Sequence, residues 1–403
     1  MSTRNITSVA RIALAVLIVM CYGFSKDSPE GSFAAGLAHA EKGSWQAAID
    51  AYSAAIKARP EWLEAYVNRG VAKAALGDYA GAIKDYDAAL RLDPQDTDAL
   101  LNRGVARHQL KQYEEALSDY TAALVLDEND VDAYCNRALT FRATGKLLAA
   151  VEDYSAAIRL EPDNAVFYRE RAAVNREQED GNAAAVDDAL AKLTEAIAAA
   201  PEDAILRRQR GLVFFEVGEY ALALSDLSEA IRIAPDDADT YVARAHAWFI
   251  QGADDVAIKD YTQALERHVE AAPEAYAGRG NAYESLGAIG NAVSDYEEAV
   301  RRDPNEVDTL MQLAWILATH PAQQYRNGQR AVELAIRAVA LTDGRHWRAL
   351  DVMAAACAEA GNFEDARKYA QWSIDLVPAD MREAVRKRST LYRSDQPYRD
   401  LGD

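Results

Sequence analysis

The sequence predicts an all-α protein, built as a solenoid of antiparallel helix pairs. A short segment recurs every 34 residues, as Tyr66-Val-Asn-Arg-Gly70, Leu100-Leu-Asn-Arg-Gly104 and Tyr134-Cys-Asn-Arg-Ala138. Alanine and glycine return at fixed positions in each unit, and proline closes most units. A period of this length is typical of repeats in which one helix pair stacks on the next.

The composition excludes several classes of function. Half of the residues are apolar, only 8% are aromatic, and the formal net charge is -20. So acidic a surface repels phosphate backbones, and we expect no nucleic-acid partner. Cys21, Cys135 and Cys357 are far apart, and the six histidines form no metal-binding motif. We therefore expect no metal and no cofactor.

Residues 1–28 differ from the remainder and are interpreted as a signal peptide or an N-terminal membrane anchor. Arg4 and Arg11 precede the apolar run Ile12–Phe24, which is shorter than the roughly 20 residues that a spanning helix needs. A cleaved secretory signal, a retained anchor and a lipid-modified Cys21 are the alternatives. The protein is accordingly expected to be exported, either periplasmic or otherwise extracytoplasmic, or anchored in a membrane through residues 12–24.

Ten repeats are predicted between residues 29 and 380, followed by a capping helix and tail at 381–403. The cap is expected at Met381 to Tyr392, with a loose tail beyond Ser394. Five extra residues are expected near Glu179–Ala183, one near the end of the seventh repeat, and several around Pro321–Gly328. The repeats are 29–62, 63–96, 97–130, 131–164, 165–203, 204–237, 238–272, 273–306, 307–346 and 347–380.

Small residues define the repeat register. Repeat position 8 is glycine or alanine, and a glycine at position 15 permits the turn between the two helices of most repeats. Alanine at position 20 lets the two helices approach closely. The position-20 residues are Ala48, Ala82, Ala116, Ala150, Ala189, Ala223, Ala257, Ala292, Ala331 and Ala366.

This combination of positions resembles the tetratricopeptide-repeat (TPR) family, and the resemblance covers residues 29–380. It implies a right-handed superhelix in which the first helices line a groove, with positions 2, 5, 9, 12 and 13 pointing into it. It also implies a non-catalytic scaffold that binds a protein or peptide in that groove. The seam around Trp315 and Tyr325 is similar to the terminal pattern of bacterial TPR arrays, which points to a bacterial source.

No enzyme motif is found in the sequence. Gly278-Arg-Gly280 begins like a dinucleotide fingerprint, but Tyr283 stands where the third glycine should be, and the repeat register accounts for Gly280. We therefore expect no catalytic residues and no enzymatic activity.

A ladder of ion pairs is predicted from two repeat positions. Position 7 is arginine in the second to eighth repeats, and position 23 is aspartate in all of these except the fifth, where Arg171 has no matching aspartate. Because the two residue types occur together, we expect each pair to form inside its own repeat. The expected pairs are Arg69 with Asp85, Arg103 with Asp119, Arg137 with Asp153, Arg210 with Asp226, Arg244 with Asp260, and Arg279 with Asp295.

The predicted partner-binding site is a strip of basic and aromatic residues at groove positions 5 and 12. We call it the groove strip. It suits a partner with acidic and aromatic or apolar groups. The alternative is that these side chains are solvated or paired with nearby carboxylates. The groove strip comprises His108, Arg142, Arg169, Arg176, Arg208, Phe215 and Phe249.

An acidic row at position 2 offers a second surface, for a basic partner. Its carboxylates also suit helix N-termini, where the macrodipole favours negative charge. The row comprises Glu64, Asp98, Asp132, Asp239, Glu274 and Asp308.

Two other contexts for a scaffold stay open. The protein is a membrane-tethered factor in envelope assembly or secretion if the N-terminal run is retained. It is a cytosolic adaptor if that run is not an export signal, as the free thiols would favour.

Overall fold

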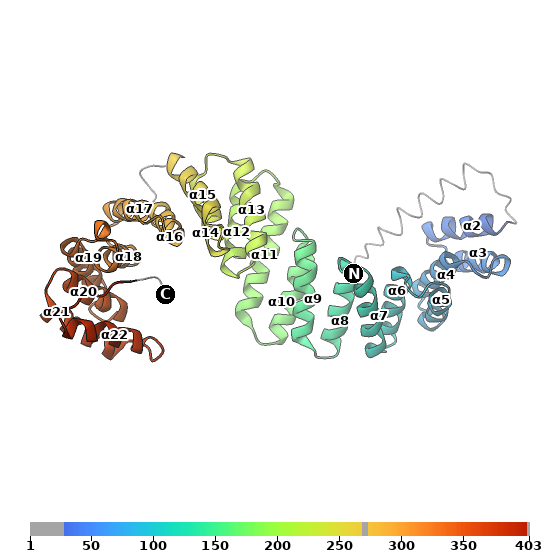
Figure 1. Cartoon of the computed structure of the whole chain (residues 1–403). Helices are drawn as coiled ribbons and strands as arrows, with labels where there is room; N and C mark the ends of the chain where they lie inside the picture. Colours follow the sequence, from blue (N-terminus) through green and yellow to red (C-terminus); the bar gives the residue numbers. More distant parts are fainter. Residues whose placement is uncertain (1–27, 268–272, 401–403) are drawn as a thin grey trace. The chain divides into compact units, whose positions relative to one another are not determined.

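The computed structural model describes residues 28–267 and 273–400, and its regular elements there are all helices (Figure 1). Within these ranges no helix combines the length and apolar character needed to cross a membrane. The predicted signal or anchor lies outside the described residues, as does the extra residue expected near the end of the seventh repeat.

The helices divide between two compact units, one ending at Ala198 and the other beginning at Ala199. The first unit contains α2 (Pro29–Glu41), α3 (Trp45–Ala58), α4 (Leu63–Ala75), α5 (Tyr79–Leu92), α6 (Thr97–Gln109), α7 (Tyr113–Leu126), α8 (Val131–Ala143), α9 (Leu147–Leu160), α10 (Ala165–Glu177) and α11 (Gly181–Ala199). The second contains α12 (Ala204–Glu216), α13 (Tyr220–Ile233), α14 (Ala238–Ile250), α15 (Asp254–Arg267), α16 (Pro273–Ser285), α17 (Ile289–Arg302), α18 (Val307–Thr319), η1 (Gln323–Tyr325), α19 (Gly328–Leu341), α20 (Trp347–Glu359), α21 (Phe363–Leu376) and α22 (Arg382–Arg393).

Within each unit, consecutive helices pack in pairs through a tight turn. In every repeat except the ninth, the turn residue at position 15 has a positive φ, 83° at Gly77 for example, which glycine adopts without strain. Lys111 and Glu179 hold the same position at 60° and 61°. The predicted all-α fold of tandem helix pairs is therefore confirmed.

Small residues at position 8 make room for a large side chain at position 24. A Cβ on Gly104 would lie 2.6 Å from Cε1 of Tyr120, whose side chain is almost fully buried. Ala116, at position 20, is fully buried beside them. Close approach of the two helices thus depends on both small residues.

The fifth repeat departs from the predicted register. Its turn passes through Glu179 without added residues, whereas α11 has 19 residues and the second helices of the other repeats have 14. Ala184 takes the buried place of the position-20 alanine, and Ala189 is only partly buried. The expected insertion near Glu179–Ala183 is therefore wrong, because the five residues lengthen the helix after the turn.

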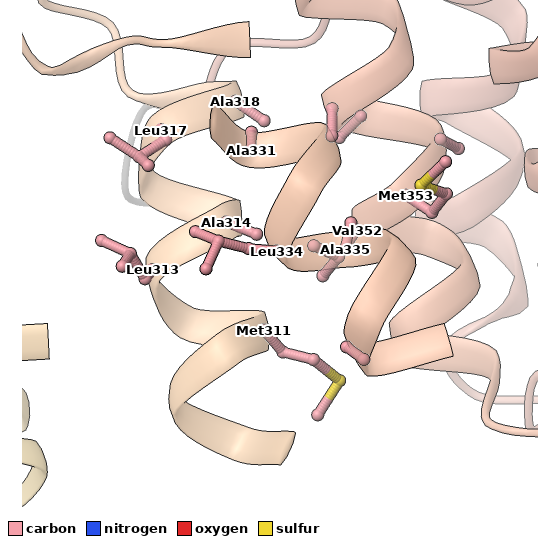
Figure 2. Close-up of a cluster of buried hydrophobic side chains, with 14 of the residues drawn as sticks. Met311, Leu313, Ala314, Leu317, Ala318, Ala331, Leu334, Ala335, Val352 and Met353 are labelled. Atoms are coloured by element: carbon pink, nitrogen blue, oxygen red, sulfur yellow. The ribbon is translucent and has the colours of Figure 1, made fainter. Parts of the chain in front are cut away.

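The largest apolar cluster is centred on the last two repeats and extends into α17 and α22. Figure 2 shows buried apolar side chains of α18, α19 and α20, among them Leu313, Leu334 and Met353. The extra residues around Pro321–Gly328 form η1 and its flanks, held by a hydrogen bond from Asn327 N to Leu317 O of 2.9 Å.

The C-terminal tail is docked rather than loose, so the expectation of a loose tail beyond Ser394 is wrong for the described residues. Trp315 Nε1 donates to Asp400 Oδ2 at 2.7 Å, and Asp400 N donates to Thr319 O at 2.9 Å. Arg399 pairs with Glu359 at 2.7 Å. These contacts hold the tail against the first helices α18 and α20.

Candidate functional site

An arginine and an aspartate bridge the two helices of each repeat from the second to the eighth, and we call this pair the clasp. Arg103 donates from Nε and Nη2 to the two carboxylate oxygens of Asp119, at 3.1 and 2.7 Å. The clasp aspartates are almost fully buried, so each needs a charged partner. Clasps of the same form join Arg69 to Asp85, Arg137 to Asp153, Arg210 to Asp226, Arg244 to Asp260, and Arg279 to Asp295.

The fifth repeat has a clasp as well. Arg171 Nη2 donates to Asp187 Oδ1 at 2.6 Å, and Asn175 Nδ2 donates to Asp187 Oδ2 at 2.9 Å. Arg171 and Asp187 are 16 residues apart, as are Arg103 and Asp119. The prediction that Arg171 lacks an aspartate is wrong, because the insertion follows Asp187 along the chain.

The clasp arginine also reaches the preceding repeat, a contact that the sequence analysis missed. Arg171 Nη1 donates to Ser155 Oγ at 2.9 Å, and Arg103 Nη1 donates to Asp87 Oδ1 at 2.7 Å. The acceptor stands at position 25 of the preceding repeat, and a recurring hydroxyl or acid there was the available signal. The acceptors are Ser53, Asp87, Thr121, Ser155, Ser228 and Thr262.

In the first unit, the groove-strip residues all have partners. His108 Nδ1 lies 2.7 Å from Thr140 Oγ1, and burial lowers the pKa of His108. Arg142 pairs with Glu177 at 2.5 Å. Arg169 pairs with Glu195, and Arg176 pairs with Asp188. The three arginines therefore lie in ion pairs.

The second unit contains the other three groove-strip residues. Arg208 lies 3.1 Å from Asp237 and 3.4 Å from Asp239. Phe215 packs edge-on against Tyr220, with ring centroids 5.6 Å apart. Phe249 is partly buried against a cluster that includes Tyr261.

Phe249 lines a cavity of about 420 Å³ in the second unit, which we call the α14–α18 pocket. Its walls come mainly from the first helices α14, α16 and α18, and six of its lining residues stand at the groove positions 2, 5, 9 and 12. His246 and Phe249 come from α14, Glu274 from α16 and Asp308 from α18. Three successive repeats thus contribute to one hollow, which the sequence analysis did not foresee.

The charges of the α14–α18 pocket have one sign. Four carboxylates line it, and none of its lining residues, all of them described, is lysine or arginine. Burial lowers the pKa of His246, which favours the neutral ring. The four carboxylates belong to Glu274, Asp303, Glu306 and Asp308.

A larger cavity, of about 710 Å³, lies between α17 and α19 but is charge-matched. Arg330 of α19 reaches Glu297 of α17 at 2.8 Å across it, and also pairs with Glu333 of its own helix at 3.2 Å. Its charged groups are therefore partly satisfied by one another, which makes it the weaker candidate for a ligand.

Cys135 and Cys357 are free thiols. Burial raises the pKa of Cys135 to about 12 and that of Cys357 to about 11. Both are therefore protonated near neutral pH and are poor nucleophiles.

Known proteins were compared with the chain by family models and by fold. Models described as tetratricopeptide repeat match residues 24–61, 33–97, 67–131, 131–164, 185–238 and 255–307, more than half of the chain. No curated protein matches the sequence.

Several solved structures are similar to the chain, all with low TM-scores. A crystal structure of MamA is 22% identical, covers 43% of this chain and 96% of its own, and has a TM-score of 0.41. Yeast Tom70 is 15% identical over 97% of this chain and 93% of its own, with a TM-score of 0.40. The first TPR of RPAP3, bound to an HSP90 peptide, is 28% identical over 30% of this chain and 96% of its own, with a TM-score of 0.29.

The repeat models match the same register that the clasps and the small-residue positions define in the structure. On that agreement, the chain belongs to the tetratricopeptide-repeat family.

Proposed function

We propose that this protein is a non-catalytic scaffold that binds a partner polypeptide on the first helices of its second unit. Its membership of the tetratricopeptide-repeat family supports the coarser statement, a protein-interaction scaffold. The site on the second unit is our own assignment.

The observation that carries the assignment is the α14–α18 pocket. First helices of neighbouring repeats contact each other, α12 with α14 and α14 with α16, so their groove positions share one face. On that face the pocket offers about 420 Å³ of space next to the ring of Phe249. A concave, partly apolar hollow with a few converging polar groups is the usual form of a recognition site.

The groove strip is a second candidate surface, and the acidic partner it predicted has less support. Each of its four arginines pairs with a carboxylate, so its positive charge is largely neutralised. An acidic partner would have to displace these carboxylates.

For location, we propose export, with the apolar run Ile12–Phe24 as a cleaved signal or a retained anchor. In the second case the scaffold is tethered to a membrane and serves envelope assembly or secretion. Mass spectrometry of the purified protein's N-terminus separates them: a start near Phe24 indicates cleavage and a start near Met1 an anchor. An intact N-terminus on protein recovered entirely from the cytosol would contradict both and would favour a cytosolic adaptor.

Site-specific photo-cross-linking tests the binding face. A benzoylphenylalanine placed at Gln312, which lines the pocket, should cross-link a discrete partner in cells that express the full chain. The same group at Glu266, on the second helix α15, should not yield that product, because Glu266 is exposed and does not line the pocket. Equal yields at the two positions, or no product from Gln312, would contradict the proposal.

A further inference from the structure

The α14–α18 pocket contains a buried polar group without a partner. Tyr261 is fully buried, lines the pocket, and has a hydroxyl with no hydrogen-bond partner among the described residues. An unpaired buried hydroxyl is destabilising, so a bound group that hydrogen-bonds to it would remove that cost.

Repeats differ in this respect: the hydroxyl of Tyr154, at the same position of the fourth repeat, is also buried without a partner, whereas that of Tyr296, in the repeat after Tyr261, is paired. Tyr296 occupies the same repeat position as Tyr261, and its hydroxyl donates to Asn281 Oδ1 or Glu284 Oε2, each 2.7 Å away. The Tyr261 hydroxyl instead faces Gly278, where a Cβ would lie 2.5 Å from its oxygen. Gly278 therefore leaves the space that the hydroxyl occupies and contributes no side chain to pair with it.

The four carboxylates that line the pocket differ in whether they accept hydrogen bonds from described residues. Glu306 accepts hydrogen bonds from the backbone N–H groups of Asp308 and Thr309, and Asp303 accepts one from Asn305. The side chains of Glu274 and Asp308 are exposed and form no ion pair with any described residue. Arg348 donates to Gln312, which lines the pocket, at 2.9 Å, but it does not pair with either carboxylate.

The pocket also offers an apolar wall. Phe249, partly buried in α14, presents a ring on the same hollow. Methylene groups pack on such a ring, and a cation is attracted to its face. A long side chain with an apolar stem and a cationic head would satisfy the ring, the carboxylates and the tyrosine oxygen together.

We infer that the α14–α18 pocket binds a lysine or arginine side chain from a basic segment of the partner protein. The cationic N–H groups donate to the carboxylates of Glu274 and Asp308 and to the hydroxyl oxygen of Tyr261. The stem of the side chain lies against Phe249. This inference rests on the proposed function and adds the chemistry of the partner.

Peptide binding to the full-length protein tests the inference. The probes are a short fluorescein-labelled peptide with one central arginine and the same peptide with lysine, citrulline or glutamate there. Arginine and lysine peptides should bind, and the citrulline peptide should bind roughly five- to ten-fold more weakly because its neutral head forms no ion pair. Equal binding of arginine and citrulline peptides would overturn the inference.

Two charge-matched double variants locate the site. Glu274→Gln with Asp308→Asn should weaken binding of the arginine peptide roughly five- to ten-fold. Asp255→Asn with Glu266→Gln, on the exposed face of α15, changes the net charge equally and should alter binding less than about two-fold. The same loss in both variants would show only general attraction to an acidic protein, and would overturn the site.

The tyrosine hydroxyl gives a readout that a structural role would not give. Tyr261→Phe removes an unpaired hydroxyl, so the melting temperature should stay equal or rise while the arginine peptide binds more weakly. Tyr296→Phe is the matched control, because it removes a paired hydroxyl and should lower the melting temperature. A Tyr261→Phe variant that melts lower and binds equally well would overturn the role of this hydroxyl.

Failure of the inference and failure of the proposed function are distinguishable. A partner that cross-links at Gln312 through a segment without lysine or arginine would overturn the cationic ligand and leave the scaffold standing. Selective binding of basic peptides without any cross-linked partner would support the ligand class and count against the scaffold.

Discussion

The second to eighth repeats and the last two repeats stabilise their helix pairs in different ways. In the former, a clasp arginine at position 7 reaches a buried aspartate, as Arg103 reaches Asp119. In the ninth and tenth repeats the same position is held by Leu313 and Met353, both buried in the large apolar cluster (Figure 2).

The two arrangements also differ in what they connect. The Nη1 atom of a clasp arginine donates to the preceding repeat, so each such clasp also links two successive repeats. The tenth repeat has a buried aspartate whose cation comes from outside the repeat. Arg388 of α22 pairs with Asp351 of α20 at 2.5 Å. The guanidinium also lies over the rings of Trp315 and Tyr398. The end is thus closed by a cap that places its own arginine on the apolar core.

The largest expected effect comes from breaking this terminal pair. Arg388→Gln leaves Asp351, which is only 3% exposed, without its cation, and should cost about 3–5 kcal/mol of unfolding free energy. A thermal or urea melt followed by circular dichroism measures it. Arg386→Gln is the control in the same helix, because Arg386 is exposed. Similar melts for the two variants would show that the cap does not depend on the pair.

The same variant has a pH dependence of known sign. Burial raises the pKa of Asp351 even beside Arg388, and removal of Arg388 should raise it further. A carboxyl whose pKa is higher in the folded than in the unfolded state loses stability as pH rises through its folded pKa. The deficit of Arg388→Gln against wild type should therefore be smallest near the unfolded aspartate pKa of about 3.9 and largest near neutrality. A deficit that grows toward acid would contradict this account.

The second to eighth repeats and the last two repeats share the buried alanine at position 20, so the same substitution there should destabilise both alike. Ala223 in the sixth repeat and Ala366 in the tenth are both fully buried at position 20. Ala223→Leu and Ala366→Leu should each cost about 1–3 kcal/mol through overpacking. Ala221→Leu, at an exposed site of the same helix as Ala223, should leave the melt unchanged. An unchanged melt for the position-20 variants would contradict the repeat register.

A double-mutant cycle isolates the clasp. Asp119→Asn should cost about 1–3 kcal/mol, and Arg103→Gln added to it should cost little more, because each single change leaves a buried partner unpaired. Arg107, also 2.7 Å from Asp119, should soften the loss in Arg103→Gln alone. Strictly additive losses would show that Arg103 and Asp119 are energetically independent.

The smallest effect concerns the link between repeats. Ser155→Ala removes the acceptor for Arg171 Nη1 and should cost about 0.5–1.5 kcal/mol. Ser118→Ala, at an exposed site on α7, is the control. A loss no larger than that of the control would show that the clasp acts only inside its own repeat.

The repeats were predictable because their signals are local and recur. The 16-residue spacing from Arg103 to Asp119 marks the clasp, and the same spacing from Arg171 to Asp187 could have placed the insertion correctly. A count of residues alone cannot tell a longer turn from a longer helix. The glycine that marks the turn in most repeats is replaced by Glu179 in the fifth, so the sequence did not show where the turn ends. The α14–α18 pocket was not predictable in this way. Whether the hydroxyl of Tyr261 has a hydrogen-bond partner depends on which side chains of neighbouring helices surround it, and no repeated sequence signal encodes that.

The docked tail has a practical consequence. The indole N–H of Trp315 is held by Asp400, a residue 85 positions away in the chain. Indole fluorescence responds to hydrogen bonding and to the polarity around the ring, so Trp315 is a built-in optical reporter of the tail. A version that keeps Trp315 and replaces the other five tryptophans with phenylalanine would let an observer follow release of the C-terminal segment separately from melting of the helices.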